Sequence, residues 1–292
     1  MHFIRFTIIW KSWLDKMKKK SITVWAFDKG VSGDYDLEII DKQLRSAGFN
    51  ALELSFSDHG TISFDTDINK LKSDYKKLRL NGIEFSSIST LLFDKVNIVS
   101  NDEAEREYAI KIVKKMVDIA SELKIKTISI SPGKVVSNSN YSLQLERALE
   151  NIRLCGVYAQ TKDVYLCIEN VWGAILVSPY DFSYFLDKVD NDYVRMCLDI
   201  GNTLMCGYPN HWFEVLGRKI KKVHYTDVKR RKNLFLEFVT PGRGNVDWKH
   251  LKEYEDFLDT EYSTVEFFYD NIRNHDSWLK ECASELDKIE RL

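Results

Sequence analysis

Four side chains that could bind a metal ion follow apolar segments in the second half of the chain. Each segment ends in one acidic or imidazole group: Glu169 after VYLCI, Asp199 after VRMCL, His224 after KKV and Glu266 after TV. Three carboxylates and one imidazole suit Mn²⁺, Mg²⁺, Co²⁺ or Zn²⁺ and leave coordination positions open for substrate oxygens. If the segments are parallel strands of one barrel, the four groups meet at its mouth and can hold one divalent cation.

The elements that must position these groups alternate eight times between a short apolar run and a longer amphipathic segment. The runs expected to be strands are 22–27, 51–56, 83–88, 127–130, 164–168, 194–198, 220–225 and 264–268. The segments expected to be helices are 36–47, 67–80, 102–123, 143–160, 180–189, 211–216, 248–257 and 277–290. This alternation is typical of parallel strands with helical crossovers, and eight repeats favour an α/β fold of the single (β/α)₈ type, a TIM barrel. No G-x-G-x-x-G follows the first strand, which weakens the alternative of a doubly wound dinucleotide-binding sheet.

Length and composition agree with one domain. The 292 residues are 44% hydrophobic and 13% aromatic, enough for the core of a barrel of roughly 250 residues. We expect the barrel to span residues 21–292, after an N-terminal extension at residues 1–20. That extension could be an amphipathic helix capping the barrel floor, or Met17 could be the physiological start. Its apolar stretch precedes its lysines, the reverse of a secretory signal.

Charge and cysteine usage restrict the partners and the compartment. The chain has 42 basic and 44 acidic residues, a net charge of −2, which predicts neither a nucleic-acid nor a membrane partner. No segment is apolar for long enough to cross a bilayer. The five cysteines are odd in number and lack close pairs, so we expect reduced core thiols and a cytoplasmic protein.

Longer phrases around the four candidate ligands carry a resemblance to a known family. The phrases are IEN (168–170), LDIGN (198–202), HYTDVKR (224–230), PGRGNVDW (241–248) and VEF (265–267). From about Ser21 onward the chain resembles the xylose-isomerase-like TIM-barrel superfamily, and specifically its sugar and sugar-phosphate isomerases and epimerases. The order and spacing of the phrases are similar to those of ketose 3-epimerases and of relatives acting on keto-inositols and hydroxypyruvate.

The resemblance implies metal ligation by Glu169, Asp199, His224 and Glu266. It also implies that Glu169 and Glu266 are the acid and base that move a proton through a metal-stabilised enediolate. Arg230 matches an arginine expected to hold a substrate oxygen. The substrate would be a small carbohydrate, and relatives often assemble as homodimers or homotetramers.

Two positions depart from the family pattern. Asn202 stands where ketose epimerases carry a histidine, and it can bind substrate by hydrogen bonds but cannot titrate near neutral pH. The glycine loop reads Gly242-Arg243-Gly244 where the family often has G-E-G. The arginine could favour an anionic substrate, or it could be an ordinary solvated loop residue.

Further substrate contacts are less specific predictions. Glu53, expected at the end of the second strand, could touch substrate at the mouth. Trp25 and Trp172, also expected at strand ends, could pack on a sugar face or fill the core. Asp227 is expected to orient a loop or contact His224, and Asn170 to fix the loop after the fifth strand.

Four functions remain to be compared. The first is a metal-dependent isomerase or epimerase of a small ketose or ketose phosphate. A keto-polyol dehydratase would use the same metal and base but expel a hydroxyl group. An apurinic-endonuclease-type phosphodiesterase would need a trinuclear zinc site with more histidines, and here Asn202 replaces one and no D-x-H follows Asp227. In a non-catalytic binding barrel we would expect one or more of the four candidate metal ligands to be replaced, whereas all four are present here.

Overall fold

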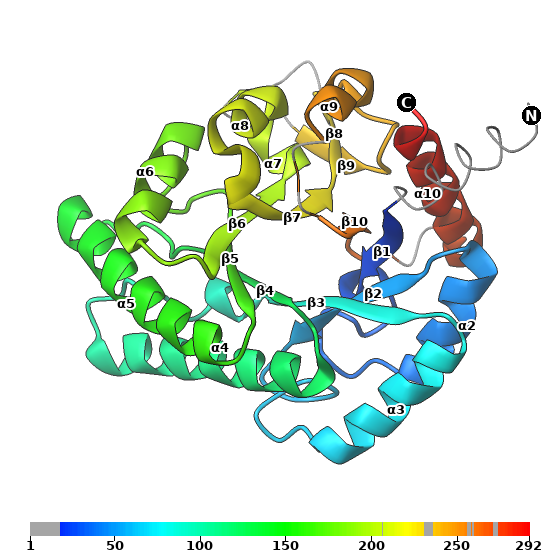
Figure 1. Ribbon diagram of the computed structural model, residues 1–292, viewed down its shortest axis with the longest axis horizontal. Helices are drawn as coiled ribbons and strands as arrows, with labels where there is room; N and C mark the ends of the chain where they lie inside the picture. Colours follow the sequence, from blue (N-terminus) through cyan, green and yellow to red (C-terminus); the bar gives the residue numbers. More distant parts are fainter. Residues whose placement is uncertain (1–17, 206, 231–235, 256–257, 259, 271–273) are drawn as a thin grey trace, which may run out of the picture.

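Eight parallel strands close into a barrel in the computed structural model, which describes residues 18–205, 207–230, 236–255, 258, 260–270 and 274–292. The closed order is β1-β10-β7-β6-β5-β4-β3-β2 (Figure 1). The barrel strands are β1 (Lys19–Thr23), β2 (Ala51–Phe56), β3 (Glu84–Thr90), β4 (Thr127–Ile130), β5 (Tyr165–Glu169), β6 (Val194–Asp199), β7 (Ile220–Tyr225) and β10 (Tyr262–Val265). The predicted single (β/α)₈ barrel is confirmed.

Helices surround the barrel, as Figure 1 shows. They are α2 (Leu37–Ala47), α3 (Ile68–Leu80), α4 (Glu103–Leu123), α5 (Tyr141–Thr161), α6 (Pro179–Val189), α7 (Ile200–Thr203), α8 (Pro209–Leu216), α9 (Trp248–Glu255) and α10 (His275–Glu290). Short 3₁₀ turns are η1 (Val24–Ala26), η2 (Leu92–Asp94) and η3 (Gly217–Lys219). An antiparallel hairpin of β8 (Asp227–Arg230) and β9 (Leu236–Val239) follows β7.

Polar residues in the sequence set where the outer helices begin. The side chains of Asp36, Asp67, Asp102 and Asn140 accept hydrogen bonds from backbone N–H groups in the first turns of α2, α3, α4 and α5. Each cap satisfies donors that have no partner inside the helix. These caps start each helix directly after the loop that leaves the mouth of the barrel.

The predicted element boundaries hold closely except at the first and last barrel strands, and the last strand, expected at 264–268, is β10 at Tyr262–Val265. β2, β4 and β7 have the predicted bounds. β1 was expected at 22–27 but begins at Lys19 and ends at Thr23, because residues 24–26 form the turn η1. Most of the predicted N-terminal extension, residues 1–17, lies outside the described residues. Within the described part of the chain, no helix is long and apolar enough to cross a membrane.

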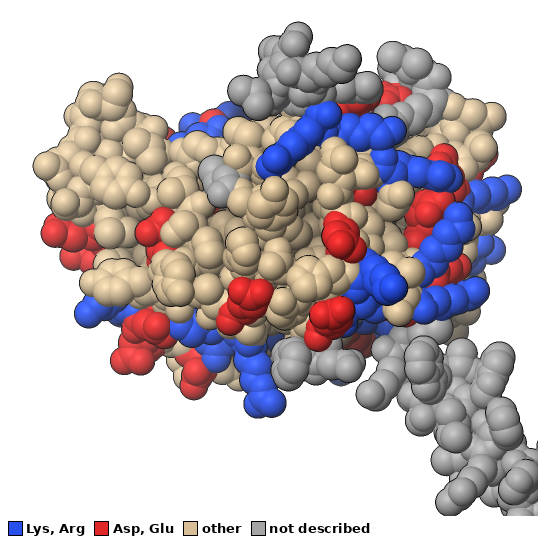
Figure 2. Space-filling model, turned by 90° about the horizontal axis from the view of Figure 1, so that it is seen from above, with Lys and Arg blue, Asp and Glu red and all other residues tan. Residues whose placement is uncertain are grey.

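The core and the surface have the expected chemistry. Cys155, Cys167, Cys197 and Cys282 are buried thiols, in agreement with the prediction of reduced core cysteines, while Cys206 lies outside the described residues. On the face drawn in Figure 2, basic and acidic side chains lie side by side along the right-hand part of the surface.

Candidate metal centre and active site

Glu169, Asp199, His224 and Glu266 converge at the carboxyl ends of four adjacent strands. One possible ligand atom from each residue lies within 4.8 Å of those of the other three. His224 Nδ1 lies 2.6 Å from Glu266 Oε2 and 3.3 Å from Glu169 Oε1. The prediction that the four side chains meet is therefore confirmed.

The barrel topology explains this convergence. β5, β6, β7 and β10 are consecutive neighbours in the closed sheet. Glu169 and Asp199 are the last residues of β5 and β6, His224 is the penultimate residue of β7, and Glu266 directly follows β10. Parallel strands end at the same rim, so four distant sequence positions become neighbours.

Asp199 is held by hydrogen bonds that occupy only one of its carboxylate oxygens. Oδ1 accepts from the Thr226 hydroxyl at 2.6 Å and from the Asn202 backbone N–H at 2.7 Å. Asn170 fixes the Asp199 backbone by accepting from its N–H at 2.8 Å and donating to its carbonyl at 2.9 Å. Oδ2 is buried and has no hydrogen-bond partner among the described residues. A buried oxygen of this kind beside two other carboxylates is suited to a cation.

His224 is fully buried and is contacted on both ring nitrogens. Nδ1 faces the carboxylate cluster, while Nε2 lies 3.0 Å from Glu53 Oε1. Glu53 also accepts from Lys222 Nζ at 2.6 Å, and Lys222 donates to the Ser129 hydroxyl at 2.7 Å. Sequence reasoning did not identify Lys222. Its position two residues before His224 was the available signal, because alternate residues of a strand face the same side.

The pKa values of the clustered side chains are shifted because several acidic groups are buried close together. Burial and the nearby Glu266 and Glu169 raise the pKa of Asp199 well above its usual range. Burial and Glu169 likewise raise the pKa of Glu266, although His224 opposes the change. Burial and Lys222 oppose a charged His224, but nearby acidic groups, including Glu53 and Glu266, raise its pKa well above the usual value. A cation in this cluster would relieve the repulsion between the carboxylates.

Glu53, which lies beneath His224, has a lowered pKa, in contrast to Asp199 and Glu266. Burial would raise the pKa of Glu53, but Lys222 and His224 lower it to about 2. Glu53 is therefore an ionised carboxylate at neutral pH.

The donor set fits one divalent cation. The three carboxylates and the imidazole are oxygen and nitrogen donors of the kind used by Mg²⁺, Mn²⁺, Co²⁺ and Zn²⁺. Cys197 Sγ lies 4.0 Å from His224 Nδ1 and forms an alternative group with Glu169 and His224. Burial raises the pKa of this thiol, so it stays protonated and the four-residue group is the better cation site.

The structure corrects the predicted positions of Glu53 and Trp25. Glu53 is the third residue of β2, which continues to Phe56, so the carboxylate lies inside the barrel below His224 instead of at the mouth. Trp25 lies in η1 and is only 3% exposed; its indole N–H donates to the Ser55 hydroxyl at 2.8 Å. Trp25 makes internal contacts because β1 ends earlier than predicted, and Glu53 does so because it lies three residues before the end of β2.

Trp172, Asn202 and Arg230 lie together on one side of the rim. The exposed Trp172 donates from Nε1 to the Asn202 carbonyl at 3.4 Å, and its ring lies 5.4 Å from that of Phe238. Arg230 donates to the Leu204 carbonyl at 2.9 Å. Substrate contact by these three residues stays a prediction that their rim positions allow.

Asp227 organises the glycine-containing loop next to the site. Its carboxylate accepts five N–H groups, those of Val228, Gly242, Gly244 and Val246 and the indole of Trp248, at 2.9–3.1 Å. The prediction that Asp227 orients a loop is thus confirmed. Arg243, at the loop tip, pairs with Glu281 at 3.0 Å and Glu285 at 2.8 Å on α10. These pairs favour the interpretation of Arg243 as a structural loop residue.

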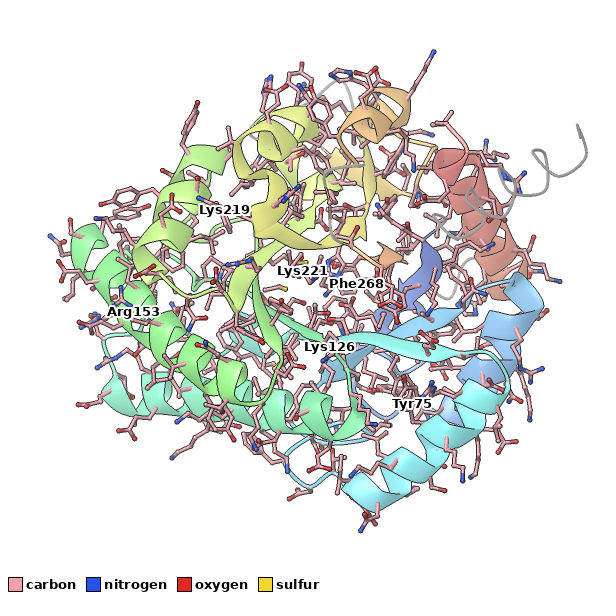
Figure 3. The ribbon with its side chains drawn as sticks, in the orientation of Figure 1. Tyr75, Lys126, Arg153, Lys219, Lys221 and Phe268 are labelled. Atoms are coloured by element: carbon pink, nitrogen blue, oxygen red, sulfur yellow. The ribbon has the colours of Figure 1, made fainter. Side chains whose placement is uncertain are left out.

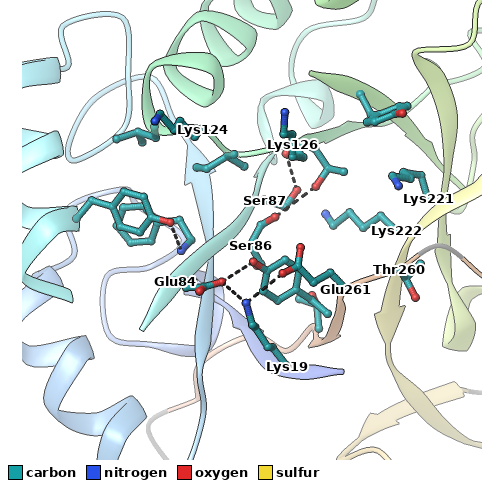
Figure 4. A pocket seen from close by; sticks show the side chains of 18 of the residues that line it. Lys19, Glu84, Ser86, Ser87, Lys124, Lys126, Lys221, Lys222, Thr260 and Glu261 are labelled. Carbon is teal, nitrogen blue, oxygen red and sulfur yellow. Dashed lines mark hydrogen bonds and ion pairs between the residues drawn. The ribbon is translucent and has the colours of Figure 1, made fainter. Parts of the chain in front are cut away.

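A separate cavity of about 590 Å³ lies at the opposite, floor end of the barrel. Residues at the starts of strands line it, among them Lys19, Glu84, Lys126 and Lys221, and Lys222 reaches it from inside the barrel (Figure 4). Figure 3 places Lys126 and Lys221 near the barrel and Arg153 over α5. The candidate ligands do not line this cavity, because they converge at the opposite end of the barrel.

A curated relative is similar in sequence to part of the chain, and solved structures are similar in fold over nearly all of it. A probable endonuclease 4 of Metamycoplasma arthritidis (strain 158L3-1) is 29% identical over 110 residues, 37% of this chain and 39% of that protein. The chain thus spans about two fifths of the length of this curated relative.

Three solved structures cover nearly the whole chain. D-psicose 3-epimerase from Clostridium cellulolyticum H10, determined with D-tagatose, has a TM-score of 0.73 at 18% identity and covers 94% of this chain and 98% of its own. The probable 3-DHS dehydratase AsbF of Bacillus anthracis has a TM-score of 0.73 at 16% identity, covering 92% and 98%. The IolI protein, which was determined with a zinc atom, has a TM-score of 0.70 at 16% identity, covering 93% and 96%. At these identities the likeness establishes the fold. Residues 42–289 match the family described as xylose isomerase-like TIM barrel, and the chain therefore belongs to that family.

Proposed function

We propose that the protein is a divalent-metal-dependent isomerase or epimerase of a small ketose. The observation that carries the proposal is the convergence of Glu169, Asp199, His224 and Glu266 at the mouth of the barrel. The epimerase and the zinc-containing structure described above support it, because they share this fold and their names state sugar epimerisation and metal binding.

The exposure of the four side chains distinguishes residues that can only hold the ion from residues that a substrate can also reach. Asp199 and His224 are buried, whereas the side chains of Glu169 and Glu266 are 11% and 14% exposed. A substrate entering from the mouth would therefore meet the two glutamates. A divalent ion, when bound, supplies Lewis-acid polarisation of the substrate carbonyl and so acidifies the adjacent C–H.

Proton transfer follows from the placement of the glutamates. One of them removes the proton from the carbon next to the carbonyl, and the other delivers a proton. Return to the opposite face of the same carbon gives epimerisation, and return to the neighbouring carbon gives aldose–ketose isomerisation. Positioned proton transfer of this kind contributes typically about 10²–10⁴-fold to the rate.

The described residues favour a neutral sugar over a phosphorylated one. Arg243 was the basic residue that could have bound a phosphate near the last two strands, but Glu281 and Glu285 neutralise it. A free ketose needs only hydroxyl-binding partners at the rim, which Trp172, Asn202 and Arg230 could supply.

The endonuclease alternative has little support in the site. Among the described residues, both candidate metal groups belong to the single cluster around His224. A trinuclear centre would need further histidine and carboxylate ligands beside it. The endonuclease relative is similar over only part of either chain.

Isotope exchange tests the proposal. The protein loaded with Mn²⁺ or Co²⁺ is incubated in D₂O with a panel of ketoses, and deuterium at the carbon next to the carbonyl is measured by NMR. We expect deuterium uptake with retention of all hydroxyl groups. Uptake accompanied by loss of water would instead indicate the dehydratase reaction.

Matched variants identify the acid and base. Glu169→Gln and Glu266→Gln should each abolish conversion of the ketose, because an amide can neither accept nor deliver the proton. Glu38→Gln, on the outer surface of α2 where Glu38 pairs with Lys42, should exchange at the wild-type rate. Full exchange in both active-site variants would refute the assignment.

A further inference from the structure

A buried ion pair crosses the barrel directly beneath the candidate metal ligands. Lys222 Nζ lies 2.6 Å from Glu53 Oε1, and the side chains are 5% and 0% exposed. The two residues are 169 positions apart in the sequence and belong to β7 and β2. Figure 4 shows Lys222 among the side chains that line the floor cavity.

The pair contacts the site through one atom. Glu53 Oε1 lies 3.0 Å from His224 Nε2, on the side of the ring away from the carboxylate cluster. Because ionised Glu53 accepts the Nε2 proton, a neutral His224 ring directs the lone pair of Nδ1 toward Glu169 and Glu266. Lys222 is in turn fixed by the Ser129 hydroxyl of β4 at 2.7 Å.

Stability alone does not account for this arrangement. Removing two charges from water has a large free-energy cost, and replacing a buried pair with apolar residues is often neutral or stabilising. Glu53 Oε2 also lacks a hydrogen-bond partner among the described residues, which adds to the cost of burial. The pair therefore calls for a role besides stability, and Glu53 contacts a candidate ligand.

We propose that Glu53 and Lys222 are positioning residues for the metal centre, with Glu53 fixing the tautomer and direction of His224 and Lys222 fixing Glu53. This inference rests on the proposed metal-dependent function. Outer partners of ligating histidines typically change metal affinity by about 10–100-fold when they are removed.

The test uses the full chain and Co²⁺ as the probe. E53L/K222M replaces the pair with apolar side chains of similar length, so that no single buried charge remains. Wild-type protein, E53L/K222M and Asp199→Asn are compared by three measurements: the Co²⁺ dissociation constant, the visible Co²⁺ spectrum and the metal-free unfolding midpoint. The matched control is K20M/D287L, which removes a Lys20–Asp287 pair at 2.8 Å between β1 and α10.

We expect E53L/K222M to fold and to bind Co²⁺ about 10–100-fold more weakly than wild type, with an altered spectrum. The control K20M/D287L should keep the wild-type dissociation constant and spectrum. E53Q/K222M, which keeps an amide oxygen to accept the Nε2 proton, should bind more tightly than E53L/K222M but less tightly than wild type. This partial recovery would not follow from a purely structural role.

Wild-type Co²⁺ affinity and spectrum in E53L/K222M would overturn the inference. If that variant does not fold, E53Q/K222M decides the question, and an unchanged dissociation constant there would also overturn it. Failure of the proposed function gives a different pattern: the wild-type protein itself binds no Co²⁺, and Asp199→Asn changes nothing.

Discussion

Replacement of Asp199 by asparagine should stabilise the metal-free protein while it abolishes metal binding. The ligand atoms of Asp199, Glu169 and Glu266 lie within 4.8 Å of one another in a buried site. At that separation and an effective dielectric constant of about 20, two unit charges repel by about 3.5 kcal/mol. Asparagine keeps Oδ1 to accept from Thr226 and Asn202, and its amide can donate to the neighbouring carboxylates.

The measured gain should be smaller than the full repulsion, because wild-type Asp199 relieves it by binding a proton. We expect the free energy of unfolding to rise by about 2 kcal/mol at pH 7, and the melting temperature by about 4–8 °C. The assay is thermal unfolding by circular dichroism after complete removal of metal.

The pH dependence has a definite sign. The folded-state pKa of Asp199 is raised above its unfolded value of about 3.9. The wild-type penalty is therefore absent below that unfolded pKa, grows as the pH rises toward the folded pKa, and is constant above it. The advantage of Asp199→Asn should shrink to nothing near pH 4.

Asp227→Asn provides a matched control with the opposite sign. Asp227 is also a buried aspartate, but its carboxylate accepts five N–H groups. An amide nitrogen would face these donors, so we expect a loss of about 3 kcal/mol. If Asp199→Asn destabilised the metal-free protein as Asp227→Asn does, the claim that charge repulsion dominates the cluster would be wrong.

Three further outcomes follow from the same geometry. A concentration of Co²⁺ at 100 times its dissociation constant should stabilise wild type by about 2.7 kcal/mol; calorimetric melting of wild type and Asp199→Asn checks this, and equal shifts would contradict the site. Metal binding should release protons and become tighter as the pH rises, because His224 and Asp199 have raised pKa values and must lose their protons to bind the ion. Titration calorimetry in buffers of different ionisation enthalpy measures the number of protons released. Zero release would contradict the assignment of these residues as ligands. Gly244→Ala should lower the melting temperature by several degrees, because its Cβ would lie 2.0 Å from Asp227 Oδ1; Gly207→Ala, where the Cβ meets nothing within 4 Å, should not.

The strand ends that carry the candidate metal ligands could be predicted because they depend on local patterns. An apolar run followed by one acidic residue identifies both a strand and its rim position, as Glu169 and Asp199 show. Parallel topology then brings the ends together without any knowledge of distant contacts.

The layer beneath the site could not be predicted in the same way. The Glu53–Lys222 pair depends on which residues of β2 and β7 face each other across the closed barrel. The pairing of β2 with β3 also shifts register between Leu52 and Glu53, and a local sequence pattern does not encode such a shift. Trp25 was misplaced for a related reason, because a 3₁₀ turn replaces the end of the expected strand.

The N–H groups that donate to Asp227 restrict which residues of this loop can change during evolution. One carboxylate fixes the path of residues 242–248, and Gly244 leaves no room for a side chain beside it. A single change at Asp227 or Gly244 is therefore costly, and a graft of this loop between homologous barrels would have to carry both together with Gly242. The side chain of Arg243 points to α10. Substitution of this residue should therefore destabilise the loop least, provided that Glu281 and Glu285 change with it.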